Sequence, residues 1–217
     1  AIGLAALLGY KFPLNFNQPY RAVSLNDFWR RWNISLSSWL RDYLYIGALG
    51  GNRKGFGRQC VNLIVTMLLG GFWHGAKWTF LIWGALHGGV LALERVWDRH
   101  RPEGFPRAPK LLGWFVTFHI VVIGWIFFRS DTFGGAIAYL AGLGGSGMES
   151  AVLTPLALVL IVGGMAIHFT PPDLGQRVAM TLREAPAPLM GVAAGIAIMI
   201  IDAMRFEGVA PFIYYQF

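Results

Sequence analysis

The stretch Gly70-Gly-Phe-Trp-His-Gly-Ala-Lys-Trp78 joins two apolar runs, residues 63–69 and 79–93. It places one ionisable histidine and one lysine between runs made mostly of leucine, isoleucine, valine and aromatic side chains. A titratable side chain at membrane depth is costly, and such a residue therefore marks a candidate functional site. We accordingly take His74 as the residue around which the function of the chain is organised.

The composition predicts an integral membrane protein. Of the 217 residues, 55% are hydrophobic and 13% are charged, and the mean hydropathy is +0.51. A soluble domain carries about 25% charged residues. Several apolar runs separated by polar loops favour spanning helices, whereas a β-barrel shows weaker, alternating segments. We therefore predict an all-α, polytopic helical membrane protein.

Charge and cysteine content restrict the partners. The net charge is +7, but the basic residues lie in short loops beside apolar runs, as in proteins that keep positive loops in the cytoplasm. We therefore expect the lipid bilayer, and no nucleic acid, as a partner. The single cysteine, Cys60, excludes an intrachain disulfide and a multi-cysteine metal site. His74 and His87 lack the i,i+4 spacing of a zinc-binding pair, so no metal is expected.

The order of segments predicts one membrane-embedded domain over residues 1–217. Residues 1–9 resemble the end of an apolar helix, and we interpret the chain as the C-terminal part of a longer protein. Spans are expected at 111–128, 153–169 and 189–201. A helix over 26–46, capped by Ser24 or Asn26, is too polar to span and fits an interfacial or re-entrant element. Its polar face either lies on headgroups or lines an internal cavity.

Charge bias also predicts the position of His74. The basic loop 47–59 and the basic segment 95–110 are both expected on the cytoplasmic side, so the residues between them form a hairpin. As a helix, residues 61–72 extend about 18 Å, which is less than the roughly 30 Å of the hydrocarbon core. The turn at His74 is therefore expected inside the membrane thickness, at the end of a pocket.

Two further patterns carry weaker predictions. Glycine pairs spaced four residues apart allow close helix contact in lipid; these are Gly71/Gly75, Gly84/Gly88 and Gly191/Gly195. Loop 47–59 lacks the Gly-Lys-Ser/Thr of a P-loop, so it is either a cytoplasmic positive loop or a site where arginine and lysine meet the phosphates of an anionic donor.

The other histidines have mainly structural interpretations. His100 lies in a charged linker, and His119 and His168 are expected to hydrogen-bond between helices. His87 is crowded by glycines, and structural and functional roles are about equally expected for it. His74 is the strongest candidate base, because neutral imidazole can accept a proton near neutral pH.

Several stretches resemble membrane-bound O-acyltransferases, most closely the branch of the alginate O-acetyltransferase membrane subunit and the teichoic-acid D-alanyl transfer protein. The similarity covers nearly the whole chain, is densest over residues 26–95, and leaves out about half of the family's usual length. The stretches are Asp27-Phe-Trp-Arg-Arg-Trp-Asn-Ile-Ser-Leu-Ser-Ser-Trp-Leu-Arg-Asp-Tyr-Leu-Tyr45, Leu49-Gly-Gly-Asn-Arg53, Leu68-Leu-Gly-Gly-Phe-Trp-His-Gly-Ala-Lys-Trp78, Gly124-Trp-Ile-Phe-Phe-Arg129 and Phe212-Ile-Tyr-Tyr-Gln-Phe217.

The resemblance implies acyl transfer in a membrane-embedded funnel. A cytoplasmic thioester donor, acetyl-CoA or another acyl thioester, would give its acyl group to a hydroxyl of a cell-surface polysaccharide or of a periplasmic acetyltransferase-like carrier protein. The implied location is the bacterial inner membrane, with several passes and no tightly bound cofactor. His74 matches the catalytic histidine of the family. Asn33 stands where many members carry histidine, and because its amide cannot act as a base it is at most a positioning group.

The expected site contains one general base, a substrate-binding set and a phosphate-binding set. His74 is the base, and Trp73 and Trp78 shape its pocket. The other members are Asn33, Arg41, Asp42 and His87 for substrate, and Arg53 and Lys54 for the donor phosphates. Two alternatives stay open: a transporter or proton relay that uses His74, His87 and Asp202, and a catalytically idle scaffold.

Overall fold

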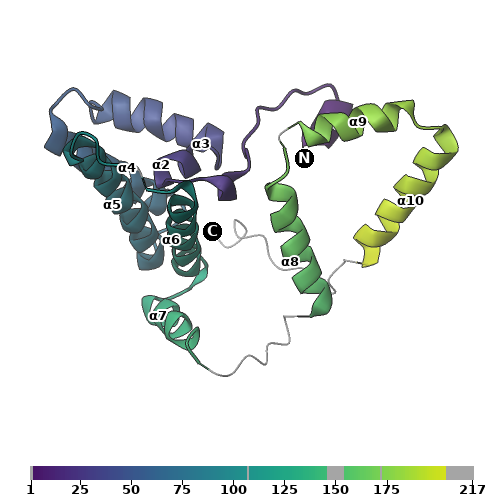
Figure 1. The fold of residues 1–217 in the computed structure, drawn as a ribbon. Coiled ribbons are helices and arrows are strands. Elements are labelled where there is room, and N and C mark those ends of the chain that lie inside the picture. The colour runs from purple at the N-terminus through teal and green to yellow at the C-terminus, as the bar shows by residue number, and fades with distance from the viewer. Residues whose placement is uncertain (1, 107, 146–153, 172, 204–217) are drawn as a thin grey trace. The chain divides into compact units, whose positions relative to one another are not determined.

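The computed structural model describes residues 2–106, 108–145, 154–171 and 173–203, in which every regular element is helical. The chain divides into two units, Ala1–Phe169 and Thr170–Phe217. The elements, drawn in Figure 1, are α1 (Ile2–Leu7), the 3₁₀ turn η1 (Pro19–Arg21), α2 (Leu25–Trp29), α3 (Ile34–Trp39), the π-helix η2 (Leu40–Ala48), α4 (Phe56–Trp73), α5 (Trp78–His100), α6 (Lys110–Arg129), α7 (Phe133–Gly142), α8 (Pro155–His168), α9 (Leu174–Glu184) and α10 (Ala187–Ala203).

The helices α4 and α5 form the predicted hairpin, with the turn at His74. However, α4 begins at Phe56 and has 18 residues, so it extends about 27 Å. The prediction of a short arm was therefore wrong. The polar residues 57–59 continue the helix, because the first turn is anchored by tertiary packing: the Arg99 guanidinium lies 4.5 Å from the centre of the Phe56 ring.

Glycines bring the two arms into backbone contact. A Cβ on Gly71 would overlap the carbonyl oxygen of Phe80, and one on Gly84 would overlap that of Met67. A Cβ on Gly88 would lie 2.8 Å from the Cα of Ile64. The small-residue prediction is therefore confirmed at Gly71, Gly84 and Gly88. By contrast, at Gly191 and Gly195 a Cβ would meet none of the described atoms within 4 Å.

The single helix predicted over 26–46 is broken in two. Asn33 adopts a left-handed conformation with φ 39° between α2 and α3, which asparagine tolerates better than most residues. After α3 the chain continues as the π-helix η2, a rare form that is frequent at functional sites. Ser24 caps α2 as predicted, since its Oγ accepts a hydrogen bond of 3.0 Å from the Asp27 amide.

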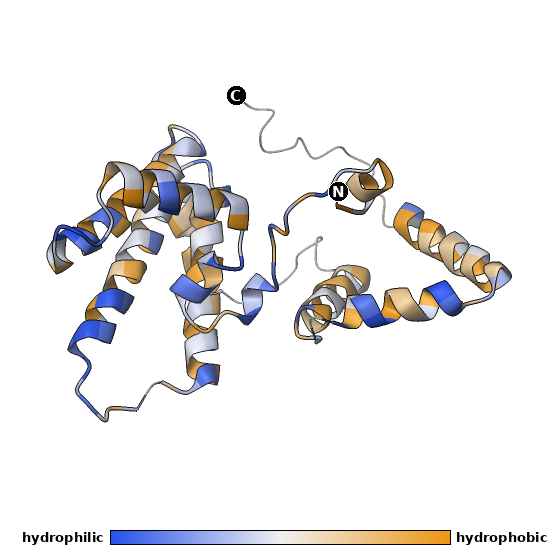
Figure 2. Ribbon diagram, turned by 90° about the horizontal axis from the view of Figure 1, so that it is seen from above, coloured by the Kyte–Doolittle hydropathy of each residue, from blue (hydrophilic) through white to orange (hydrophobic). Residues whose placement is uncertain are grey.

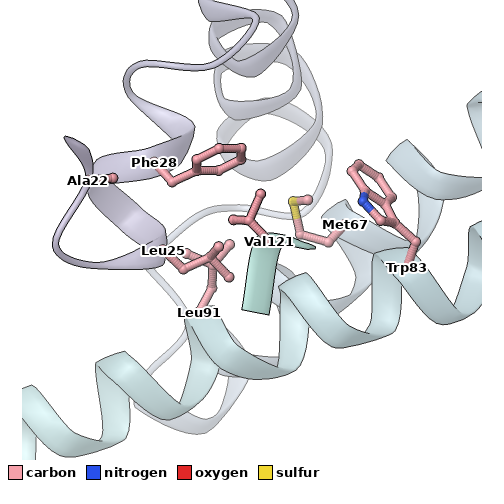
Figure 3. Close-up of a cluster of buried hydrophobic side chains, with 7 residues drawn as sticks. All are labelled: Ala22, Leu25, Phe28, Met67, Trp83, Leu91 and Val121. Carbon is pink, nitrogen blue, oxygen red and sulfur yellow. The ribbon is translucent and has the colours of Figure 1, made fainter. Parts of the chain in front are cut away.

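A hydrophobic core joins α2 to the hairpin and to α6 (Figure 3). Phe28 is 1% exposed and Trp83 is 2% exposed. Burying side chains of this size is worth about 1.5–3 kcal/mol each, so this cluster fixes the short helix α2 against the hairpin. Its buried members are Ala22, Leu25, Phe28, Met67, Trp83, Leu91 and Val121.

Glu94 of α5 binds the start of α2. Its carboxylate accepts hydrogen bonds from the Leu25 amide at 2.6 Å and from the Asn26 amide at 3.0 Å. We expect Glu94→Gln to lower the free energy of unfolding by about 1–3 kcal/mol, because one of these charge-assisted bonds is replaced by a clash between two donors. Thermal unfolding in detergent measures the change. Glu103→Gln, in the exposed linker, is the control, and equal stability of the two variants would contradict the capping role.

Among the described residues, α6 alone is long and apolar enough to cross a bilayer by length and composition. The prediction for 111–128 is therefore confirmed as a helix. The runs at 153–169 and 189–201 form the shorter helices α8 and α10, and α7 and α9 were not predicted. In Figure 2, α10 is hydrophobic along nearly its whole length, whereas α9 carries hydrophilic residues as well. The aromatic motif 212–217 lies outside the described residues.

Candidate functional site

His74 ends α4 and lies inside a ring of aromatic side chains. The centre of its imidazole is 4.9 Å from those of Trp73 and Phe128, 5.5 Å from that of Trp83 and 6.1 Å from that of Phe80. Its Nδ1 is buried without a hydrogen-bond partner among the described residues, whereas Nε2 is not buried in this way. Of the two ring nitrogens, Nε2 is therefore the better candidate for contact with a substrate.

Two polar contacts fasten the turn after His74 to the end of α6. Lys77 Nζ lies 3.0 Å from Asp131 Oδ1, and the Thr79 hydroxyl donates a hydrogen bond of 3.1 Å to the Ser130 carbonyl. The Lys77 ammonium lowers the pKa of the Asp131 carboxyl below its usual range, so the ion pair is present at neutral pH. These contacts hold the end of α6, and with it Phe128, beside His74.

A separate cavity of about 670 Å³ lies under α2, α3 and η2, against one face of the hairpin. Four arginines line it, and no acidic residue does among the described part of the chain: Arg30, Arg41, Arg53 and Arg95. A concave site with this charge favours an anionic ligand, since arginine binds phosphate through paired N–H groups. His74 does not line this cavity.

The loop after η2 is held in place by a buried asparagine. Asn62 is fully buried, and its amide nitrogen donates hydrogen bonds to the carbonyls of Leu49 at 3.1 Å and Gly51 at 2.9 Å. Arg53, in that loop, donates to the carbonyls of Gly50 and Ile46. These bonds fix the backbone of the loop at the edge of the cavity.

Arg41 and Asp42, expected together at a polar wall, pair with each other at 2.7 Å on an exposed part of η2. Arg41 lines the cavity and Asp42 does not. Hydrogen bonding from the Arg41 guanidinium lowers the pKa of the Asp42 carboxyl. The pair therefore reduces, at neutral pH, the positive charge that Arg41 brings to the cavity.

His87 lies in the core between the cavity and His74. It is 0% exposed, and its ring centre is 4.7 Å from that of Trp83 and 5.4 Å from that of Trp29. Neither ring nitrogen has a hydrogen-bond partner among the described residues. A Cβ on Gly124 would lie 2.9 Å from its Nε2. Trp29 also lines the cavity, and Trp83 also contacts His74.

The structure thus brings together only part of the expected site. Arg41 and Arg53 share the cavity, whereas Lys54 is exposed and does not line it. Trp73 contacts His74 and is 62% exposed, and Trp78 is 77% exposed. Asn33 lies at the break between α2 and α3, outside the cavity lining.

Sequence reasoning missed Arg30, Arg95 and the supporting Asn62. Arg30 directly follows α2, Arg95 lies on α5 and Asn62 on α4, and only tertiary packing places the two arginines at the same cavity. The one available signal was the polar Asn62 within the apolar run of α4, because a buried amide must find partners.

The part of the chain that contains the hairpin and the cavity is similar in sequence to known proteins. The family model of membrane-bound O-acyltransferases matches residues 1–131. The probable alginate O-acetylase AlgI of Azotobacter vinelandii is 37% identical over an alignment covering 100% of this chain and 50% of that protein. The peptidoglycan O-acetyltransferase of Helicobacter pylori is 46% identical over 67% of this chain and 27% of its own length.

A less similar relative is named for the transfer of a different group, D-alanine. The teichoic acid D-alanyltransferase of Streptococcus thermophilus is 31% identical over 59% of this chain and 35% of its own length. The chain spans about half the length of the first of these relatives and less of the others. Since the family model covers more than half of the chain, including His74 and all four cavity arginines, the chain belongs to the membrane-bound O-acyltransferase family.

Proposed function

We propose that this chain supplies the catalytic histidine and the donor-binding cavity of a multi-pass, inner-membrane O-acyltransferase. It would move an acetyl or similar small acyl group from a thioester to a hydroxyl of a cell-surface polysaccharide or of its periplasmic carrier protein. The observation that carries the proposal is His74, which packs among aromatic side chains and whose Nε2, unlike its Nδ1, is not a buried atom without a partner. The names of the relatives, two O-acetyltransferases and a D-alanyltransferase, support the reaction class.

In the proposed reaction, His74 Nε2 takes the proton of the acceptor hydroxyl as its oxygen attacks the thioester carbonyl carbon. The tetrahedral intermediate then collapses, the carbon–sulfur bond breaks, and the proton passes from the imidazole to the leaving thiolate. One ester forms and one thiol is released. The aromatic side chains around His74 exclude bulk water, so hydrolysis of the thioester does not compete.

The donor is proposed to place its phosphate groups in the arginine-lined cavity. Acetyl-CoA carries phosphates at one end and the thioester at the other, so one donor would need both a cationic cavity and a separate base. Arg53 is proposed to bind the donor phosphates, as the sequence suggested. Arg30, Arg41 and Arg95, which line the same cavity, are proposed to bind them with Arg53 in place of Lys54.

We expect Arg53→Gln to raise the KM for the donor about 10- to 100-fold, because a lost charge-assisted bond costs about 1.5–3 kcal/mol. The kcat should stay nearly unchanged, since this contact is the same in the ground and transition states. Steady-state kinetics at varied donor concentration measures both constants. Lys54→Gln, the adjacent exposed residue, is the control. A change of similar size in both variants would point to a general charge effect and not to the cavity.

The function itself is tested with the full-length protein reconstituted in liposomes. Consumption of acetyl-CoA that depends on an added polysaccharide or carrier protein, with an ester on the acceptor, supports the enzyme. Uptake of a solute or of protons without any acyl donor would instead support the transporter alternative. Donor consumption without any acceptor would indicate a hydrolase and contradict the proposed exclusion of water.

A further inference from the structure

We infer that the aromatic side chains around His74, with Phe128 as the principal member, set an upper limit on the length of the acyl group that is transferred. They admit an acetyl group and reject longer straight chains. This inference rests on the proposed function, because it takes His74 as the base of an acyl transfer.

The position of the acyl group follows from the chemistry at His74. The acceptor oxygen must lie about 2.6–3.2 Å from the histidine nitrogen, and the thioester carbon about 3–3.5 Å from that oxygen. The carbon chain therefore starts about 6 Å from the imidazole. Phe128, Trp83 and Phe80 have their ring centres 4.9 to 6.1 Å from the imidazole centre. The first carbons of the acyl chain must consequently pack against these rings.

The enclosure has little freedom to widen. The Phe128 ring centre lies 4.9 Å from that of Phe80 and 5.5 Å from that of Trp83, so the three rings support one another. Gly71 leaves no space between α4 and the backbone of α5. The hydroxyl of the buried Thr79 also donates a hydrogen bond to the Ser130 carbonyl at the end of α6. A longer acyl chain therefore cannot be accommodated by a simple shift of one helix.

A tightly packed apolar wall discriminates strongly by size. One methylene more or less in a hydrophobic pocket changes specificity about 10- to 200-fold. Replacing Phe128 by alanine removes a ring that touches His74, Phe80, Trp83 and Trp125. Under this inference, the space that the substitution opens receives the acyl chain of a longer donor.

The experiment compares acetyl-, propionyl-, butyryl- and hexanoyl-CoA as donors for the full-length protein, with kcat/KM as the readout. For the wild type we expect at least a tenfold fall with each added methylene. For Phe128→Ala we expect the ratio of butyryl to acetyl transfer to rise at least tenfold. The milder variant Phe128→Leu should change the ratio in the same direction and keeps the test decisive if the alanine variant does not fold.

Phe127→Ala is the matched control. Phe127 is the adjacent residue on α6 and is buried, whereas Phe128 is partly buried; the Phe127 ring stacks on Phe133, with 6.2 Å between the centres, and not on His74. An unchanged chain-length profile in both Phe128 variants, with acetyl transfer retained, overturns the inference and leaves the proposed function standing. An equal shift in the Phe127 variant overturns it as well. A wild type that transfers no acyl group from any thioester overturns the proposed function and the inference together.

Discussion

His74→Gln in the full-length protein is expected to lower kcat/KM for acyl transfer by a factor of at least about 100, the usual contribution of a general base. Glutamine fills a similar volume and keeps hydrogen-bonding groups, but it cannot take a proton near neutral pH. The surrounding rings should stay in place, because His74 makes no side-chain hydrogen bond among the described residues. The loss should therefore appear in catalysis and not in the temperature of unfolding.

The measurement is acceptor-dependent release of CoA, with the temperature of unfolding recorded for each variant. His119→Gln provides the control, since His119 lies exposed on α6 and its Nδ1 lies 2.8 Å from the Phe115 carbonyl of the same helix. It should keep wild-type activity. A His74→Gln protein with wild-type kcat/KM would show that the proton is taken elsewhere, and the function assigned to the hairpin would then fail.

The hairpin was predictable because its signals are local. Two apolar runs separated by glycine and an ionisable histidine leave few arrangements other than two helices and a turn, and His74 was identified from the cost of its burial alone. The start of α4 was not predictable in this way. Residues 57–59 are polar and glycine-containing, and they are helical because Phe56 packs on Arg99, a residue that is distant in sequence.

The break between α2 and α3 shows a second limit. Apolar side chains recur at helical spacing through residues 29–43, so their pattern predicts one continuous helix. The break depends on the left-handed backbone of Asn33, and the shape of the following segment depends on the wider turns of η2. Neither feature changes the spacing of the apolar side chains along the sequence. Both are needed to place Arg30 and Arg41 at one cavity, and for this reason the cavity could not be derived from the sequence.

In the hairpin of α4 and α5 the two backbones are in close contact at glycines. Gly84→Ala is expected to disrupt this hairpin. The new Cβ would overlap the carbonyl oxygen of Met67 and lie 3.0 Å from the Cα of Leu68. These are backbone atoms, which cannot rotate away, so α4 and α5 must separate. Overpacking of this kind costs about 1–3 kcal/mol, or a few degrees in the temperature of unfolding. Because His74 directly follows α4 and Trp83 lies on α5, separating the helices disturbs the contact between them. We therefore expect kcat/KM for acyl transfer to fall even where the protein stays folded.

Gly89→Ala is the matched control for this substitution, since Gly89 lies on the same helix and a Cβ there would meet none of the described atoms within 4 Å. Alanine is a better helix former than glycine by about 0.5–1 kcal/mol, so this variant should be as stable as the wild type or slightly more so. Thermal unfolding in detergent and acceptor-dependent CoA release measure both variants. If Gly84→Ala had the same unfolding temperature and the same activity as Gly89→Ala, α4 and α5 would have room to accept the added methyl group. The rigid aromatic enclosure proposed around His74 would then lose its structural basis, whereas the general-base role of His74 would not be affected.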